Sequence, residues 1–251
     1  MGSLGLSLIA FACIFGATLL GMYLRVLLPA EHLSTESRDA IRLSMGVIGT
    51  MAALVLGLLI ASAKGTYDAK NTQIRQLTVD IIVLDQLLAQ YGPETHALRD
   101  LLRRGAASLA DRIWSERDVA TATKTAFAMT GEAEAFLHKV EELAPQTEVQ
   151  RSIRARAITT LTDLAQTRLS LYAQPGNAIP WPFLALLVFW LAIIFASFSL
   201  FVAPNPIVVV SFFVCAFSAA GALFLIFELD RPFTGLMTIS DLPLRHALGP
   251  I

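Results

Sequence analysis

The chain of 251 residues is 55% hydrophobic and only 16% charged, with a formal net charge of -1 at pH 7. Its mean hydropathy of +0.62 lies on the membrane side of ordinary globular composition. The near-neutral charge argues against a nucleic-acid partner, and the length leaves room for little more than a few spanning helices and one modest bundle.

Four apolar runs, two on each side of a polar middle, are long enough to cross a bilayer as helices. They cover residues 4–28, 43–63, 181–203 and 207–227. No Lys or Arg precedes the first run, which is also too long for a signal peptide, so we expect it to be retained. The sequence therefore predicts an all-α polytopic membrane protein with four transmembrane helices, two and two, around an inserted helical bundle.

Four segments follow from this pattern. We expect a first transmembrane pair at 1–63, a bundle continuous with the second helix at 64–179, a second pair at 180–229 and a C-terminal tail at 230–251. Basic residues near the predicted helix ends favour the side that holds both termini and the bundle, so we place that side in the cytoplasm of a bacterial inner membrane. The opposite side holds a linker at about residues 29–42, a turn at 204–206, and Arg25, Arg38 and Arg42.

The second apolar run meets no helix breaker where the bilayer ends. After Ile60 the chain continues through Lys64 and then repeats apolar residues at spacings of three and four as far as Tyr91. We expect one helix of about 50 residues to leave the membrane and enter the bundle. Gly92 and Pro93 are in the order expected for its end.

Three more helices are predicted in the polar middle, at residues 98–113, 127–140 and 149–171. Their apolar stripes are typical of a bundle core, and their arginine clusters are typical of a solvated surface. The glutamates at 132–142 form no ligand-like sequence pattern with a His or Cys, and Cys13 and Cys215 lie in apolar runs as small hydrophobes. We therefore expect a protein that is not an enzyme and that uses no metal or cofactor.

Small residues gather on one face of the second span and one face of the fourth. They are Gly46, Gly49, Thr50, Ala53, Gly57 and Ala61, and Ser211, Cys215, Ser218, Ala219 and Ala222. Helix packing within the membrane is the favoured interpretation, because small residues let backbones approach closely. The alternative is a pore-lining face in a symmetric oligomer, since four helices carry too few polar groups for an aqueous path of their own. No Lys, Asp or Glu lies at mid-membrane depth, which disfavours a proton-coupled transporter.

Two stretches resemble bestrophins. The apolar-Gly-apolar step at Gly57, followed by Ser62 and Tyr67-Asp68, resembles the neck helix of bacterial bestrophins. The sequence after the fourth span is similar to bestrophin tails through Glu228, Asp230, Arg231, Pro232 and Phe233, followed by Asp241, Leu242, Pro243 and Leu244. Through residues 84–94 and 228–233 the chain is similar, over nearly its whole length, to a bacterial bestrophin-like membrane family.

The resemblance implies an ion channel formed by several copies of the chain, with five around a central pore. The second helix would line a hydrophobic neck with rings at Thr50, Leu54 and Leu58, and apolar rings gate by dewetting. Two positions depart from the pattern, because Thr50 stands where a bulky apolar residue is expected and Met51 where Pro often follows. No acidic run suits a calcium clasp, so calcium gating is not predicted.

A bestrophin-like channel is the leading functional hypothesis, with the bilayer, ions and further copies of the chain as its partners. The main alternative is a non-conducting membrane scaffold whose bundle binds a partner. A sensor is the third possibility, and it would need a pocket around Tyr91, Trp114 or Tyr172, where aromatic core packing is the more common use.

Overall fold

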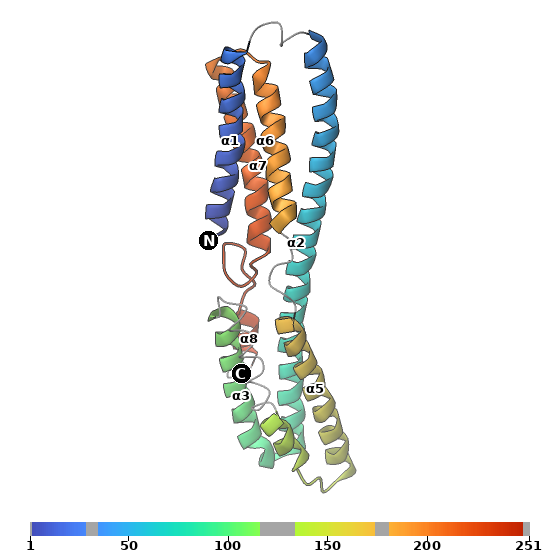
Figure 1. The fold of residues 1–251 in the computed structure, drawn as a ribbon. Coiled ribbons are helices and arrows are strands. Elements are labelled where there is room, and N and C mark those ends of the chain that lie inside the picture. Colours follow the sequence, from blue (N-terminus) through green and yellow to red (C-terminus); the bar gives the residue numbers. More distant parts are fainter. Residues whose placement is uncertain (1, 29–34, 116–133, 174–180, 248–251) are drawn as a thin grey trace. The chain divides into compact units, whose positions relative to one another are not determined.

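The computed structural model describes residues 2–28, 35–115, 134–173 and 181–247, and helices are the regular elements of these segments. Four helices are long and apolar enough to cross a membrane. They are α1 (Ser3–Leu27), α2 (Thr35–Tyr91), α6 (Trp181–Leu200) and α7 (Pro206–Leu229) (Figure 1). The prediction of an all-α chain with four such helices is confirmed.

The chain forms two compact units. Unit 1 contains residues 1–66 and 177–230, and unit 2 contains residues 67–176 and 231–251. Helix α2 contributes to both, because the division falls between Thr66 and Tyr67. At 57 residues this helix confirms the expectation of one long helix that continues from the membrane into the bundle.

Helix α2 begins earlier than the sequence indicated. It starts at Thr35, so the second half of the linker expected at residues 29–42 is helical, and that boundary was wrong. The physical reason is the lack of a stop signal, since neither Gly nor Pro occurs between residues 31 and 45. The linker was predicted from the polarity of this stretch alone, but polar residues can also form a helix.

Unit 1 is built on α1, which packs against α6 and α7. Phe11 and Phe15 of α1 meet Phe213 of α7 edge to face, with ring centroids 5.3 and 5.4 Å apart. The turn between α6 and α7 ends with Asn205, whose side-chain oxygen accepts a hydrogen bond from the Ile207 N–H at 3.2 Å. Pro206 follows as the first helical residue, where a missing N–H costs nothing.

Unit 2 is a helical bundle around the second part of α2. Its other elements are the 3-10 helix η2 (Pro93–Thr95), α3 (His96–Ser115), a helical stretch at 134–141, α5 (Glu148–Ala173) and α8 (Leu242–His246). Leu77 and Leu84 of α2 are completely buried at the centres of two apolar clusters. Residues 127–133 of one predicted helix lie outside the described residues, and the other two predicted bundle helices are confirmed.

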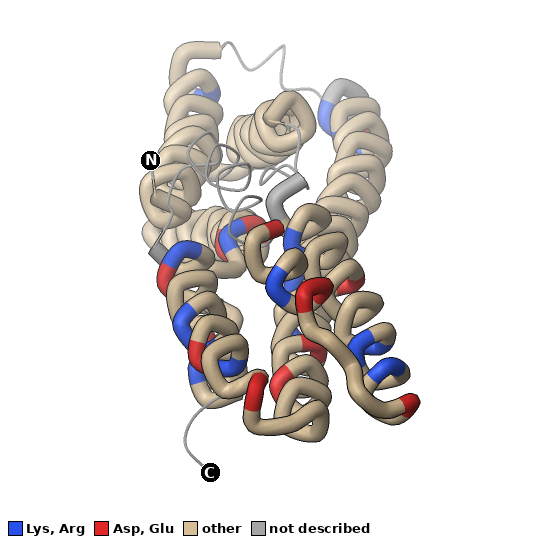
Figure 2. The backbone as a smooth tube through the Cα atoms, turned by 90° about the horizontal axis from the view of Figure 1, so that it is seen from below, with Lys and Arg blue, Asp and Glu red and all other residues tan. Residues whose placement is uncertain are grey.

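Charge distinguishes the two kinds of helix. Viewed from below in Figure 2, the blue and red positions gather on the helices of the bundle, while the apolar helices are mostly tan. Charged helix faces such as these need contact with water, whereas the apolar helices can lie in the hydrocarbon of a bilayer.

Candidate functional site

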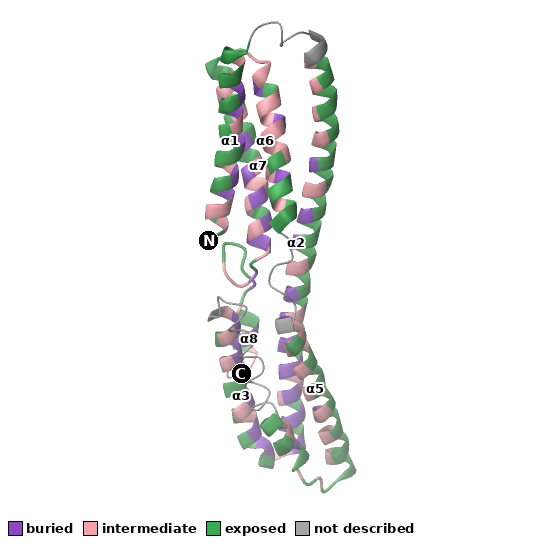
Figure 3. Ribbon diagram, in the orientation of Figure 1, coloured by how far each residue is buried: buried purple, intermediate pink, exposed green. Residues whose placement is uncertain are grey.

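One face of α2 is exposed along much of its length in the part of the chain that the structure describes. From Leu43 onward, one row of exposed residues recurs at spacings of three and four, which places the row on a single helical face. The row includes Leu43, Val47, Thr50, Leu54, Leu58, Ala61, Gly65, Asp68, Thr72, Arg75 and Val79. We call this row the exposed stripe of α2. Other residues of the apolar part of α2, such as Met51 and Ile60, are exposed as well. Figure 3 shows exposed residues in green along much of the helix.

The three predicted neck residues lie on the exposed stripe. Leu54 is 75% exposed and Leu58 is 66% exposed, whereas Leu59, one residue further on, is 6% exposed because it faces its own chain. The Thr50 hydroxyl donates to the Val47 carbonyl at 2.8 Å, so its polarity is satisfied within the helix. The stripe is apolar from Leu43 to Leu58, interrupted by this satisfied threonine, and is polar from Asp68 to Arg75.

Several of the small residues expected at a packing or pore face are also exposed in a single copy of the chain. Gly46 and Gly57 have no atom of another element within 4 Å of the position that a Cβ would occupy. Ala61 on α2 and Ser211, Cys215 and Ser218 on α7 are exposed. Within one copy of the chain these residues do not bring helices together, so their contact with lipid, water or another copy stays a prediction.

A close approach of two helices in unit 1 lies elsewhere, at Gly21 of α1. A Cβ on Gly21 would lie 2.1 Å from Ser199 Oγ and 2.3 Å from the Ala196 carbonyl oxygen of α6. Only glycine permits this contact. The role of Gly21 was not predicted because it depends on the α6 residues opposite it. Gly21 and Ser199 are nevertheless small residues of the kind that such interfaces use.

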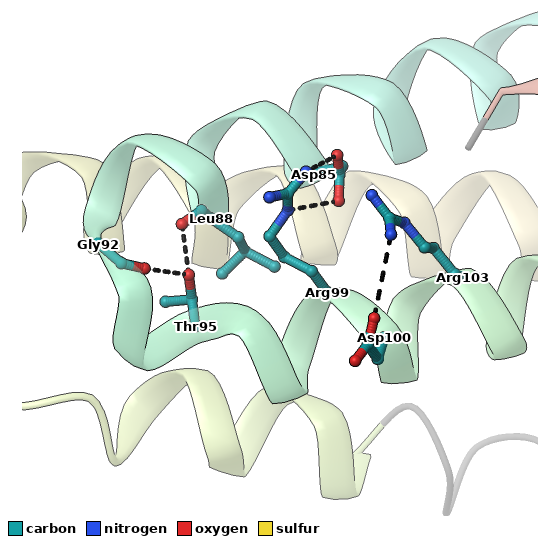
Figure 4. A network of polar contacts seen from close by, with 7 residues as sticks. All are labelled: Asp85, Leu88, Gly92, Thr95, Arg99, Asp100 and Arg103. Carbon is teal, nitrogen blue, oxygen red and sulfur yellow. Dashed lines mark hydrogen bonds and ion pairs between the residues drawn. The ribbon is translucent and has the colours of Figure 1, made fainter. Parts of the chain in front are cut away.

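The end of α2 is fixed by a compact polar network (Figure 4). Gly92 has a φ of +144°, and a Cβ there would lie 2.6 Å from the Glu94 carboxylate. The buried Thr95 hydroxyl lies within hydrogen-bond distance of the Leu88 and Gly92 carbonyl oxygens and can donate to either. The predicted Gly-Pro stop is therefore confirmed, with the turn of η2 added to it.

A two-point ion pair joins α3 to α2 next to this turn. Arg99 Nε and a terminal guanidinium nitrogen lie 2.8 and 2.7 Å from the two carboxylate oxygens of Asp85. This parallel pairing is the strongest geometry that the two groups can adopt, and it raises the pKa of Arg99. Arg103 and Asp100, at 3.9 Å on the surface, make a much weaker pair.

The tail motif divides between the two units. Glu228, near the end of α7, is 2% exposed and accepts a hydrogen bond from the Ser3 hydroxyl of α1 at 2.6 Å. Asp230 is the C-cap of α7. In unit 2, Arg231 is exposed, the buried Pro232 accepts the Ile239 N–H at 2.8 Å, and Phe233 enters the bundle core.

Trp114 of α3 holds the tail to the bundle. Its ring meets Phe233 edge to face at 5.7 Å, and its Nε1–H donates to the Ile239 carbonyl at 2.9 Å. Arg245 of α8 pairs with Asp111 of α3 at 2.8 Å, and Leu244 is buried. The hydrogen bond from Arg245 also lowers the pKa of Asp241. Burial of the tail and formation of α8 were not predicted, because both depend on contacts more than a hundred residues distant in sequence.

Two of the residues named for a sensor pocket, Tyr91 and Trp114, contact other parts of unit 2. Tyr91 is buried at the end of α2, where its carbonyl accepts a hydrogen bond from Gln150, and Trp114 is occupied by the tail. The side chain of Tyr172 lies outside the described residues. A groove of about 470 Å³ does open in unit 2, lined by α2 and the tail. Its lining residues are Tyr67, Asn71, Ile74, Arg75, Thr238, Ile239, Ser240 and Pro243.

The fold and its four apolar helices define a polytopic helical membrane protein. A family model described as Bestrophin-like domain matches residues 12–244. Because the match extends over nearly all of the sequence, the chain belongs to the bestrophin-like family.

Solved structures agree with this assignment at the level of the fold. Two crystal structures of point variants of a bacterial bestrophin homologue from Klebsiella pneumoniae superpose on the chain. The first has a TM-score of 0.69 at 11% identity and covers 96% of this chain and 95% of its own. The second has a TM-score of 0.62 at 12% identity, with 94% and 96% covered. Comparison with curated proteins found no match.

Proposed function

We propose that this protein is an oligomeric ion channel, with five copies of the chain around a pore that α2 lines. The observation that carries the proposal is the exposed stripe of α2, with Leu54 and Leu58 more than half exposed in a single copy. The bestrophin-like family and fold support it. In this arrangement the stripes of the five copies face one another across water.

The composition of the stripe fits a pore with one narrow apolar section. Rings of Thr50, Leu54 and Leu58 would form the hydrophobic neck, where a narrow column of water is unstable and ions are held back. The polar residues from Asp68 to Arg75 would line the wider path beyond it. No charged ring lies in the neck, so this part of the pore would set a barrier without choosing the sign of the ion.

The open glycines of α2 fit the same assembly. Gly46 and Gly57 leave the helix surface bare, which would allow neighbouring copies of α2 to approach closely. The orientation follows from the basic residues, which favour a cytoplasmic bundle and cytoplasmic termini in the bacterial inner membrane. No step in this function uses a catalytic group or a cofactor.

Ion flux from liposomes tests the proposal. Purified protein should pass ions, and the double variant Leu54→Ala, Leu58→Ala should pass them faster because a wider, less apolar neck stays wet. Ile60→Ala is the matched control, since Ile60 is exposed but lies off the stripe. A protein that passes no ions in either form would instead be a scaffold, which predicts conductance equal to that of empty bilayer.

A further inference from the structure

A second feature of unit 1 has no role in the proposed pore. A pocket of about 150 Å³ lies where α1 and α6 end and α2 begins. Its lining consists of Arg25 of α1, Arg38 of α2, and Leu200 and Phe201 at the end of α6. Among the described residues, two guanidinium groups thus face one small cavity beside two apolar residues.

Neither arginine has an acidic partner in the described part of the chain, where no ion pair joins Arg25 or Arg38 to a carboxylate. The Nε of Arg38 is buried and has no hydrogen-bond partner there. Two like charges beside one cavity repel each other, and a buried donor without an acceptor is costly. An anion with several oxygens would offset both costs.

The position of the pocket indicates what kind of anion reaches it. Arg25 is in the last turn of α1, and Leu200 is the last residue of α6, so the pocket lies where these apolar helices leave the hydrocarbon. Tyr23 and Val26, close to Arg25, are 62% and 74% exposed, as expected for side chains that meet lipid near the interface. Lipid phosphates occupy this depth in either leaflet, and arginine side chains can bind their oxygens.

We infer that Arg25 and Arg38 form a binding site for a phosphate-bearing anion, supplied by an anionic phospholipid or by free phosphate. The planar guanidinium forks match phosphate oxygens in pairs, and Leu200 and Phe201 offer an apolar edge for the start of an acyl chain. The site does not depend on whether the protein conducts ions.

Mass spectrometry of the intact chain in detergent can measure this binding. Phosphatidylglycerol should stay bound to the wild-type protein, with an affinity at least about tenfold higher than for the double variant Arg25→Gln, Arg38→Gln, because two charge-assisted contacts are lost. Arg42→Gln is the matched control, since Arg42 is one turn from Arg38, exposed, and outside the pocket. It should bind the lipid as the wild type does.

Inorganic phosphate distinguishes the two sources. If the lipid alone raises the Tm of the wild type, by about 2–4 °C, and the double variant loses this rise, the source is the bilayer. If phosphate alone gives the same arginine-dependent rise, the source is the free anion. Equal lipid binding by the wild type and a double variant that keeps its unliganded Tm would overturn the inference, and so would a protein that neither ligand stabilises. The single variants Arg25→Gln and Arg38→Gln provide the same comparison if the double variant does not fold.

Discussion

The two units place the same kind of side chain in opposite surroundings. On α2, Leu54 and Leu58 of unit 1 are mostly exposed, while Leu77 and Leu84 of unit 2 are fully buried. Water drives apolar side chains into a core, and helices within a bilayer gain no such driving force from one another. Unit 2 is therefore held by a conventional apolar core, and unit 1 depends on close steric contact such as that at Gly21.

Among these substitutions, truncation of a leucine in the bundle core should lower the stability of the protein the most. We expect Leu84→Ala to lower the free energy of unfolding by about 3 kcal/mol, because it removes apolar contacts and leaves a cavity. Thermal unfolding in detergent measures the loss. Leu54→Ala on the same helix is the control and should change stability by about 0.5 kcal/mol or less. Equal losses in the two variants would contradict the division of α2 into buried and exposed parts.

A methyl group at Gly21 tests the steric contact in unit 1. Gly21→Ala should cost about 1–3 kcal/mol, because the new Cβ would overlap the backbone of Ala196 on α6. The Tm of the purified protein reports the change. Gly16→Ala on the same helix meets nothing within 4 Å and should be neutral or slightly stabilising. If both variants behave alike, α1 and α6 are not in tight contact.

One partly buried hydrogen bond that helps to attach the tail can be removed with little loss of volume. Trp114→Phe deletes the Nε1–H donor to Ile239 and should cost about 1 kcal/mol. Hydrogen exchange at residues 238–246 should become faster. Trp181→Phe, at a side chain that is 76% exposed, should leave this exchange unchanged.

A fall in pH should destabilise α8 in the tail, and this effect should be the smallest of those predicted here. The pKa of Asp241 is lowered by Arg245, so the pair contributes stability at neutral pH and loses it as the pH falls through the folded-state pKa of Asp241. The pair is exposed, so the effect should be slight and should weaken with salt. Hydrogen exchange of α8 at falling pH measures it, and Asp241→Asn should remove the pH dependence that Asp100→Asn retains.

The long helices could be predicted because they carry local signals, whereas the short α8 could not. Length and hydropathy predicted the four apolar helices, and the spacing from Ile74 to Tyr91 with the stop at Gly92 and Pro93 predicted the course of α2. The start of α2 at Thr35 was missed because polar residues without Gly or Pro carry no clear boundary.

The sites were less predictable because they depend on distant partners. The spacing of Thr50, Leu54 and Leu58 showed that they share a face, but only the structure shows that the face is open in one copy. The roles of Gly21 and Trp114 follow from Ala196 and Ile239, which no local pattern connects to them. Arg38 was assigned to a linker, so its place beside Arg25 was not foreseen.

Ion flux through liposomes that contain the wild type, the double variant Leu54→Ala, Leu58→Ala or Ile60→Ala tests the central claim most directly. The account predicts measurable flux for the wild type, faster flux for the double variant and unchanged flux for Ile60→Ala. Flux equal to that of empty liposomes in all three would contradict it, and would leave the exposed stripe of α2 as a surface for lipid or for assembly alone.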